Sequence, residues 1–185
     1  MKKQSRNSVF LRLNSLTRAA MLAAISVVIG IFCKNFLNFG NGLFRVTFEN
    51  LPILLTGLLY GPVAGGLVGI ASDLTSYLLS SQAYPPNLIV TLGAFTVGFL
   101  SGLTSKHLIR RQGYPQIILS CAVAHLVGSV VVKSLGLYQF YGILTLWRIP
   151  LYTLIIAPIE ILLLCLLLRN RTVRRLTGYS LKENS

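Results

Sequence analysis

Three carboxylates interrupt the long apolar segments of this chain: Glu49, Asp73 and Glu160. If these segments span a membrane, an acidic side chain near the bilayer centre costs about 2.5–3.5 kcal/mol on insertion scales, so it usually faces a packed interior or a cavity. A carboxylate can accept two parallel hydrogen bonds from an arginine or from an amino-substituted heterocycle. The three acids are therefore candidates for internal pairing or for gripping a planar ligand.

Asp73 is the first candidate for ligand contact. Tyr77 lies one helical turn further along, at i+4, so the two side chains predict a polar, aromatic stripe on one helix face. An internal ion pair or a packing hydrogen bond is the alternative role for Asp73. Glu49 is the second candidate, and because Arg45 lies one turn before it, a local ion pair between these two residues is an equally good interpretation.

Glu160 and His125 are expected to serve packing or coupling rather than ligand binding. Glu160 follows Pro158 in the last apolar segment, and His125 lies midway along the fifth. The three cysteines lack the spacing of metal ligands. The sequence also lacks a Walker A loop, an H-E-x-x-H motif and a G-x-S-x-G motif. We therefore expect no metal, no cofactor and no catalysis, with a small membrane enzyme acting on a lipid headgroup as the alternative.

Transmembrane helices are the elements that must position these residues. Hydrophobic residues make up 54% of the chain and charged residues only 11%. A helix needs about 20 apolar residues to cross a hydrocarbon core of ~30 Å. The second of the predicted segments is short and contains Pro52, so a tilted, kinked or re-entrant helix is also possible there. The six predicted segments are 17–37, 47–60, 63–81, 88–105, 116–135 and 147–168.

The positive charges predict the orientation of these helices. Of the 17 Lys and Arg residues, 13 fall within residues 2–18, 106–111 and 169–182, which six crossings place on one side. Because cytoplasmic loops accumulate Lys and Arg, the formal net charge of +13 indicates a lipid bilayer rather than nucleic acid. The predicted fold class is an all-α membrane protein with six transmembrane helices and both termini in the cytoplasm. The outer connections are then 38–46, 82–87 and 136–146.

The remaining basic residues are predicted near the outer ends of the helices, together with many aromatic residues. Aromatic belts and snorkelling Lys or Arg side chains are common at membrane interfaces, which is one explanation. Their concentration opposite the cytoplasmic charge also predicts a cationic, aromatic-lined mouth for a flat, anionic ligand. The basic residues are Lys34, Arg45, Lys133 and Arg148, and the candidate ligand-binding set is Arg45, Glu49, Asp73, Tyr77, Tyr84, Lys133, Trp147 and Arg148.

Small residues spaced four apart mark helix faces that can pack closely in lipid. Packing within the bundle explains every such pair by itself. The alanines lie near the cytoplasmic end of the first helix, so they are the best candidates for docking a partner protein. The pairs are Ala19 with Ala23, Ala20 with Ala24, Gly65 with Gly69 and Gly98 with Gly102.

Several motifs resemble one family of membrane proteins. From about residue 14 to residue 169 the chain is similar to the substrate-binding S components of energy-coupling factor (ECF) transporters. The resemblance is carried by FRVTFENLPI at 44–53, GLLYGPVAGGLVG at 57–69 and SDL at 72–74, together with the alanines of the first helix. The opening FRVTF, the Asp-Leu pair and YPP at 84–86 look most like the folate-specific members, the FolT family.

The resemblance implies a function and partners. An S component of this kind would capture folate from outside and deliver it inward after docking, through its alanine face, on a transmembrane coupling subunit with two cytoplasmic ATPase subunits. It would be a multi-pass protein of the bacterial cell membrane. Another vitamin, such as riboflavin, pantothenate or a precursor, is the alternative ligand.

The resemblance also implies three regions and roles for the candidate residues. Residues 1–16 would form a basic cytoplasmic tail, 17–170 the six-helix substrate-binding domain and 171–185 a second basic cytoplasmic tail. Basic residues would bind the two carboxylates of folate, and aromatic residues would contact its flat pterin. The carboxylate of Asp73, or as second choice that of Glu49, would accept hydrogen bonds from the amino-pyrimidine edge of the pterin.

Overall fold

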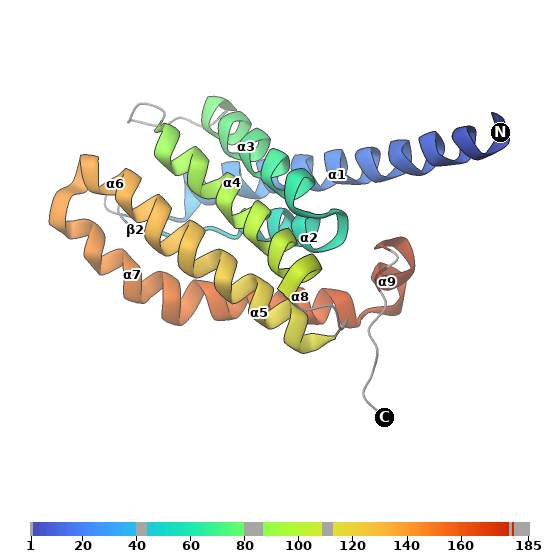
Figure 1. Cartoon of the computed structure of the whole chain (residues 1–185). Coiled ribbons are helices and arrows are strands. Elements are labelled where there is room, and N and C mark those ends of the chain that lie inside the picture. The colour runs from blue at the N-terminus through green and yellow to red at the C-terminus, as the bar shows by residue number, and fades with distance from the viewer. Residues whose placement is uncertain (1, 40–43, 80–86, 109–112, 178, 180–185) are drawn as a thin grey trace.

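The structure of the protein is a computed structural model that describes residues 2–39, 44–79, 87–108, 113–177 and 179. It is a bundle of helices with one very short hairpin (Figure 1). In chain order the elements are α1 (Lys2–Phe36), β1 (Asn38–Phe39), β2 (Phe44–Arg45), α2 (Asn50–Tyr60), α3 (Pro62–Leu79), α4 (Leu88–Leu103), the π-helix η1 (Thr104–Leu108), α5 (Tyr114–Ala124), the π-helix η2 (His125–Val132), α6 (Lys133–Tyr141), the 3-10 helix η3 (Gly142–Trp147), α7 (Arg148–Leu151), the π-helix η4 (Tyr152–Ile156), α8 (Ala157–Arg169) and α9 (Arg171–Thr177).

Five helical stretches of the described chain are long and apolar enough to cross a membrane. They are Ser15–Phe36, Pro62–Leu79, Leu88–His107, Tyr114–Gln139 and Gly142–Arg169. Helix α1 begins at Lys2, so residues 2–16 are helical and continuous with the first apolar helix, and this part projects beyond the other helices in Figure 1. The first turns of α1 and helix α9 lie towards the same end of the molecule in Figure 1, and the cytoplasmic location of that end stays a prediction.

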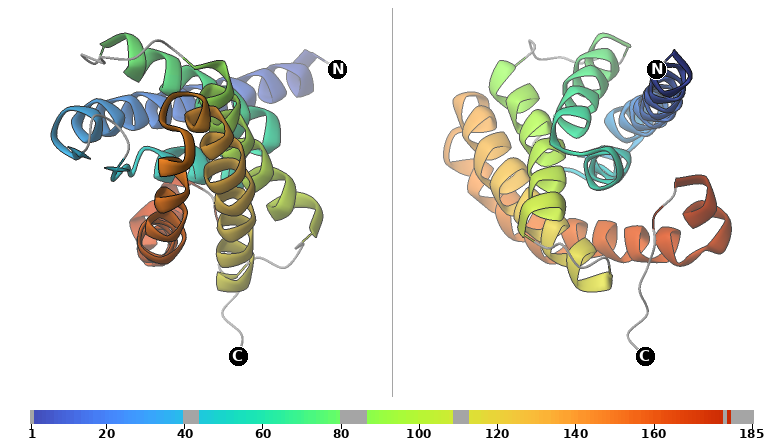
Figure 2. Two further views of the ribbon diagram at one scale, coloured as in Figure 1. Left: turned by 90° about the vertical axis from the view of Figure 1, so that its left-hand side faces the viewer. Right: turned by 45° about the vertical axis from the view of Figure 1, so that its right-hand side comes forward.

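The second predicted crossing forms a helix, but a short one. Helix α2 has 11 residues and rises only ~16 Å, about half of a hydrocarbon core. Most of its residues are buried, and it lies between α1, α3 and α4 (Figure 2). It ends at Gly61, whose φ of 102° turns the chain directly into α3 at Pro62. Helix α2 is therefore an interior element of the bundle, and the count of six crossings stays a prediction.

Glycines set the spacing of α2, α3 and α4. A Cβ atom built on Gly98 would lie 2.1 Å from the carbonyl oxygen of Gly65, and one on Gly57 would lie 2.3 Å from the carbonyl oxygen of Gly98. Only hydrogen fits at these positions, so the helix backbones touch, as small residues allow in membranes. The prediction that the Gly65 and Gly98 motifs pack within the bundle is confirmed.

The predicted outer connection at 136–146 is wrong in its extent. The helix that begins at Tyr114 continues through η2 and α6 to Tyr141, and η3 starts immediately afterwards. Gly142 makes the reversal possible, because its φ of 57° is in the left-handed region that glycine adopts without strain. The connection between α6 and η3 is therefore a tight turn at Gly142.

At the end of the bundle near α9, a residue beyond that helix packs back onto the core. Tyr179 is 7% exposed and belongs to the cluster of buried apolar residues around Leu58 and Leu168. Its hydroxyl donates to Oε1 of Gln116 at 2.7 Å, and Nε2 of Gln116 donates to the carbonyl oxygen of Ser105 at 2.8 Å. The C-terminal segment is therefore tied to α5 and η1.

Candidate ligand-binding site

A buried polar cluster surrounds Glu49. Its carboxylate lies between two ammonium groups, with Oε2 4.0 Å from Nζ of Lys34 and Oε1 3.8 Å from Nζ of Lys133. All three residues are at most 4% exposed. We call these residues, with Asn50 and Ser76, the Glu49 cluster.

The backbone around Glu49 is fixed to α1. Glu49 is the N-cap residue of α2, and its carbonyl oxygen accepts a hydrogen bond from Oγ of Ser26 at 2.7 Å. Its N–H donates to Oγ1 of Thr47 at 3.3 Å. On α1, a Cβ atom at Gly30 would lie 2.8 Å from Oε2 of Glu49, so the missing side chain leaves room for the carboxylate.

The two lysines come from opposite sides of the bundle. Lys34, in the last turn of α1, donates to Oγ of Ser76 on α3, and that hydroxyl donates to the carbonyl oxygen of Asp73 at 3.1 Å. Lys133, the first residue of α6, donates to Oδ1 of Asn50 at 3.0 Å. The cluster therefore joins α1, α2, α3 and α6.

Tyr152 and Arg148 extend the cluster towards α7 and η4. Nδ2 of Asn50 donates to the hydroxyl of Tyr152 at 2.8 Å, and Cζ of Arg148 lies 4.7 Å from the centre of the Tyr152 ring. Nη1 of Arg148 also donates to the carbonyl oxygen of Ser129 at 3.5 Å. Arg148 is 4% exposed, whereas its neighbour Trp147 is 69% exposed and lies on the surface.

Asp73 lies in the contact between α3 and α4. Its Oδ2 accepts a hydrogen bond from Oγ1 of Thr91 at 2.7 Å, and the residue is 8% exposed. Thr91 is held in turn by the carbonyl oxygen of Asn87, the N-cap residue of α4. Tyr77, one turn beyond Asp73, is half-buried. The structure thus places Asp73 beside the Glu49 cluster through Ser76, with its carboxylate engaged by a neutral hydroxyl.

Two predicted site residues cannot be compared with this geometry. The side chain of Arg45 and the whole of Tyr84 lie outside the described residues, so the pairing of Arg45 with Glu49 stays a prediction. The backbone of Arg45 is placed, because β2 pairs antiparallel with β1 and sets Arg45 opposite Asn38.

Positive charge exceeds negative charge in this region. Among the described side chains, Lys34, Lys133 and Arg148 supply three buried cations, whereas Glu49 and the neighbouring Asp73 supply two buried carboxylates. Burying a charge away from water costs several kcal/mol unless an opposite charge or good hydrogen bonds compensate it. The region therefore favours an anionic ligand.

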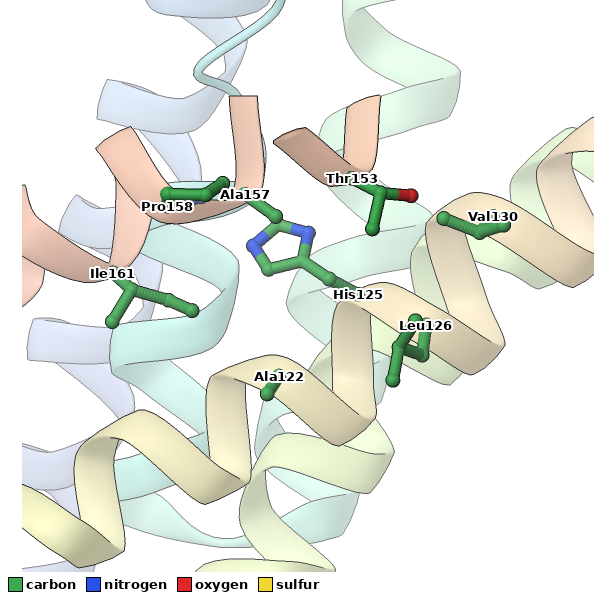
Figure 3. A pocket seen from close by; sticks show the side chains of 8 residues that line it. All are labelled: Ala122, His125, Leu126, Val130, Thr153, Ala157, Pro158 and Ile161. Atoms are coloured by element: carbon green, nitrogen blue, oxygen red, sulfur yellow. The ribbon is translucent and has the colours of Figure 1, made fainter. Parts of the chain in front are cut away.

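His125 and Glu160 form a second buried polar pair, deeper in the bundle. Nε2 of His125 lies 3.0 Å from Oε2 of Glu160, at ion-pair distance although not in the direction of a hydrogen bond. His125 also lines a small cavity of about 160 Å³ between η2 and α8 (Figure 3). The other lining residues are Ala122, Leu126, Val130, Thr153, Ala157, Pro158 and Ile161.

This cavity does not suit a large anionic ligand. Pockets for small molecules usually measure about 300–1,000 Å³, and this one is smaller and almost entirely apolar. His125 and Glu160 contact each other, in agreement with the packing role expected from the sequence.

Four residues of the site escaped the candidate set drawn from the sequence. The sequence marks Lys34 only as a basic residue near a helix end, and its position within an apolar segment is the available signal. Asn50 and Ser76 are polar residues in apolar helices, which is a weak signal. Nothing in the sequence marks Tyr152, because its role depends on the helix that faces it.

The alanine face of α1 is divided. Ala19 is 7% exposed and belongs to the apolar core, and Ala23 packs against that core. Ala20 and Ala24 are exposed. The second pair is therefore the more accessible one.

The fold and the cluster together define a class: a helical membrane protein with a buried polar centre rich in cations. A family model described as "ECF transporter, substrate-specific component" matches residues 14–174. The chain belongs to this family, so it is an integral membrane protein and a transporter subunit rather than an enzyme.

The individual relatives share only limited sequence identity with this chain. The chain is 28% identical over 120 residues to a protein named "Folate transporter FolT" from Clostridium novyi (strain NT), covering 64% of this chain and 67% of the relative. A solved structure described as "Structure and mechanism of the S component of a bacterial ECF transporter" is similar with a TM-score of 0.63 and 24% identity, over 85% of this chain and 95% of the other. Another, "Crystal structure of FolT bound with folic acid", has a TM-score of 0.59 and 22% identity, over 80% and 90%. At these identities the solved structures establish the fold alone.

Proposed function

We propose that this chain is the high-affinity folate-binding S component of an ECF-type importer. The observation that carries the proposal is the group of buried cations around Glu49, which suits a ligand with two carboxylates. The relative named as a folate transporter supports the choice of vitamin. The role as substrate-specific component follows from the family.

The carboxylates of folate would be bound by the basic residues of the site. Lys34 and Lys133 flank Glu49, and Arg148 lies against Tyr152, whose hydroxyl accepts a hydrogen bond from Asn50 of the same cluster. Arg45 would add a further cation from the hairpin. Hydrogen bonds between ammonium or guanidinium groups and carboxylates are about twice as strong as those between neutral groups.

Asp73 is the better acceptor for the amino-pyrimidine edge of the pterin. Its present partner is the neutral hydroxyl of Thr91, which a pair of N–H donors could replace or join. The carboxylate of Glu49 already lies between two ammonium groups, so its charge is engaged there. The half-buried ring of Tyr77 supplies an aromatic surface one turn away, with Tyr84 and Trp147 as the other aromatic candidates.

Calorimetric titration of the detergent-purified chain tests the proposal. We expect tight, one-to-one binding of folate, and no binding of riboflavin or pantothenate in the control titrations. Tight binding of one of the controls without folate binding would keep the family and reject the vitamin. An absence of binding with all three ligands would reject the folate proposal.

We also propose that Ala20 and Ala24 form the part of the alanine face that docks on the coupling subunit, which works with two cytoplasmic ATPases. Both residues are exposed, whereas Ala19 and Ala23 pack inward. Replacing Ala24 by leucine should leave folate binding intact and lower uptake in cells that contain the complete transporter. Ala71→Leu, at an exposed position of α3, is the matched control. Normal uptake by the Ala24 variant would contradict the docking surface.

A further inference from the structure

Glu49 occupies the position that best suits an incoming anion. Its carboxylate lies at the N-terminus of α2, where the helix dipole favours negative charge, and between the ammonium groups of Lys34 and Lys133. A carboxylate of the ligand would be attracted to the same place for the same reasons. The chain therefore supplies its own anion there.

The carboxylate is held to the two lysines by charge rather than by hydrogen bonds. Its oxygens lie 3.8 Å and 4.0 Å from the ammonium nitrogens, beyond the usual range of about 2.7–3.2 Å for a hydrogen bond. Lys133 approaches Asn50 more closely, at 3.0 Å, and Lys34 donates to Ser76. Neutral partners thus keep the lysines in place independently of the carboxylate.

The backbone of Glu49 is fixed separately from its carboxylate. Ser26 and Thr47 hold the carbonyl and N–H groups of Glu49. The carboxylate rests against the bare backbone of α1 at Gly30, and three rotatable bonds separate it from its own backbone. A shift of this carboxylate would leave the entry into α2 unchanged.

We propose that Glu49 is an internal counter-ion, which occupies the anion position of the empty protein and is displaced by a carboxylate of the ligand. The inference rests on the proposed function in taking a dicarboxylate such as folate as the ligand. In the empty state Glu49 compensates the buried lysines, which would otherwise destabilise the fold. During transport its return would compete with the bound carboxylate and assist release. Glu49 is then a specificity residue, and it does not grip the pterin.

Substitution of Glu49 by glutamine separates these roles. The ligands for titration are folate, its carboxylate half N-(4-aminobenzoyl)glutamate and the uncharged 6-hydroxymethylpterin. Without the competing carboxylate, E49Q should bind the first two at least about tenfold more tightly. Its affinity for the pterin should stay unchanged. Weaker or equal binding of the carboxylate ligands, or loss of pterin binding, would overturn the inference.

Two further variants serve as a control and as a second test of the counter-ion role. Glu160→Gln makes the same chemical change at another buried glutamate and should leave all three affinities unchanged. Gly30→Ala leaves Glu49 in the chain but places a methyl group 2.8 Å from the position of Oε2 and 3.1 Å from Cβ of Ser76, and since the contact with Oε2 is the closer one, it should displace the carboxylate and also tighten folate binding. This variant decides the question if E49Q does not fold.

A measurement without folate distinguishes failure of the inference from failure of the proposed function. Glutarate, a simple dicarboxylate, should raise the melting temperature of E49Q more than that of the wild-type protein. Equal shifts in the two proteins would overturn the counter-ion role. If the wild-type protein fails to bind folate while glutarate protects E49Q selectively, the vitamin is wrong and the counter-ion role stands.

Discussion

Substitution of Lys133 by methionine tests the core of the proposed site. Methionine keeps a long unbranched stem, which is needed because Lys133 packs against α4: a Cβ atom at Gly93 would lie 2.4 Å from Cγ of Lys133. The substitution removes the ammonium group near Glu49 and the hydrogen bond to Asn50. Packing is therefore nearly conserved, and charge is lost.

The expected loss of ligand affinity follows from the charge. A hydrogen bond to a charged group contributes about 1.5–3 kcal/mol, which corresponds to a roughly 10- to 150-fold weaker Kd for folate. The loss of a buried ion-pair partner also destabilises the protein. Such losses cost about 3–5 kcal/mol when no counter-charge remains, and we expect the lower end because Lys34 still lies 4.0 Å from Glu49.

Calorimetry for the Kd and thermal unfolding in detergent for the stability are the two assays. Lys106→Met is the matched control, because Lys106 is exposed and donates only to the carbonyl oxygen of Tyr60 among its described hydrogen bonds. The double variant Glu49→Gln/Lys133→Met should be no more stable than Lys133→Met alone, since the buried ammonium group of Lys34 then loses the carboxylate that compensates it. A Kd for folate within threefold of wild type would refute the assignment of Lys133 to the site.

Three other substitutions test separate parts of the argument. Asp73→Asn can still accept the hydrogen bond from Thr91, yet it should weaken folate binding roughly 100-fold by calorimetry, and an unchanged Kd would move the pterin contact elsewhere. Gly98→Ala should lower the free energy of unfolding by about 3 kcal/mol or more because helix backbones must separate, whereas Gly113→Ala, with its nearest neighbour at 3.5 Å, should be tolerated in the same melting assay. Burial raises the pKa of Tyr179 to about 12, above the usual ~10, so the unfolded chain releases this proton first and stability should fall between about pH 10 and 12. Tyr179→Phe should remove that part of the pH dependence, and an identical pH profile would count against burial of the phenol.

The sequence determined the class and family of this protein. Long apolar runs and clustered Lys and Arg residues are local properties, because the length of a helix that spans a bilayer and the charge of a cytoplasmic loop need no tertiary contact. The glycine motifs likewise predicted tight helix packing, and the backbones do meet at Gly65 and Gly98. The motifs around residues 44–74 indicated the family that residues 14–174 match.

The sequence located the ends of elements less well. Helix α2 reads as a weak membrane span, and only its burial between α1, α3 and α4 shows that it is an interior helix. The helix ending at Tyr141 continues past its predicted end at residue 135, because α6 packs against α4 and Nδ2 of Asn87 donates to the carbonyl oxygen of Gly136 at 2.6 Å.

Only the tertiary structure decided which polar residues share a site. Lys34 and Lys133 are 99 positions apart in the numbering, and no local pattern relates them, yet both ammonium groups flank one carboxylate. The same packing separates Arg148, which is buried, from its neighbour Trp147, and divides the alanine face between core and surface. The hydrophobicity of a segment indicates whether it enters the membrane. Which of its side chains meet is fixed by how closely the glycine-rich helices approach and how each helix is rotated, and those quantities exist only in the assembled bundle.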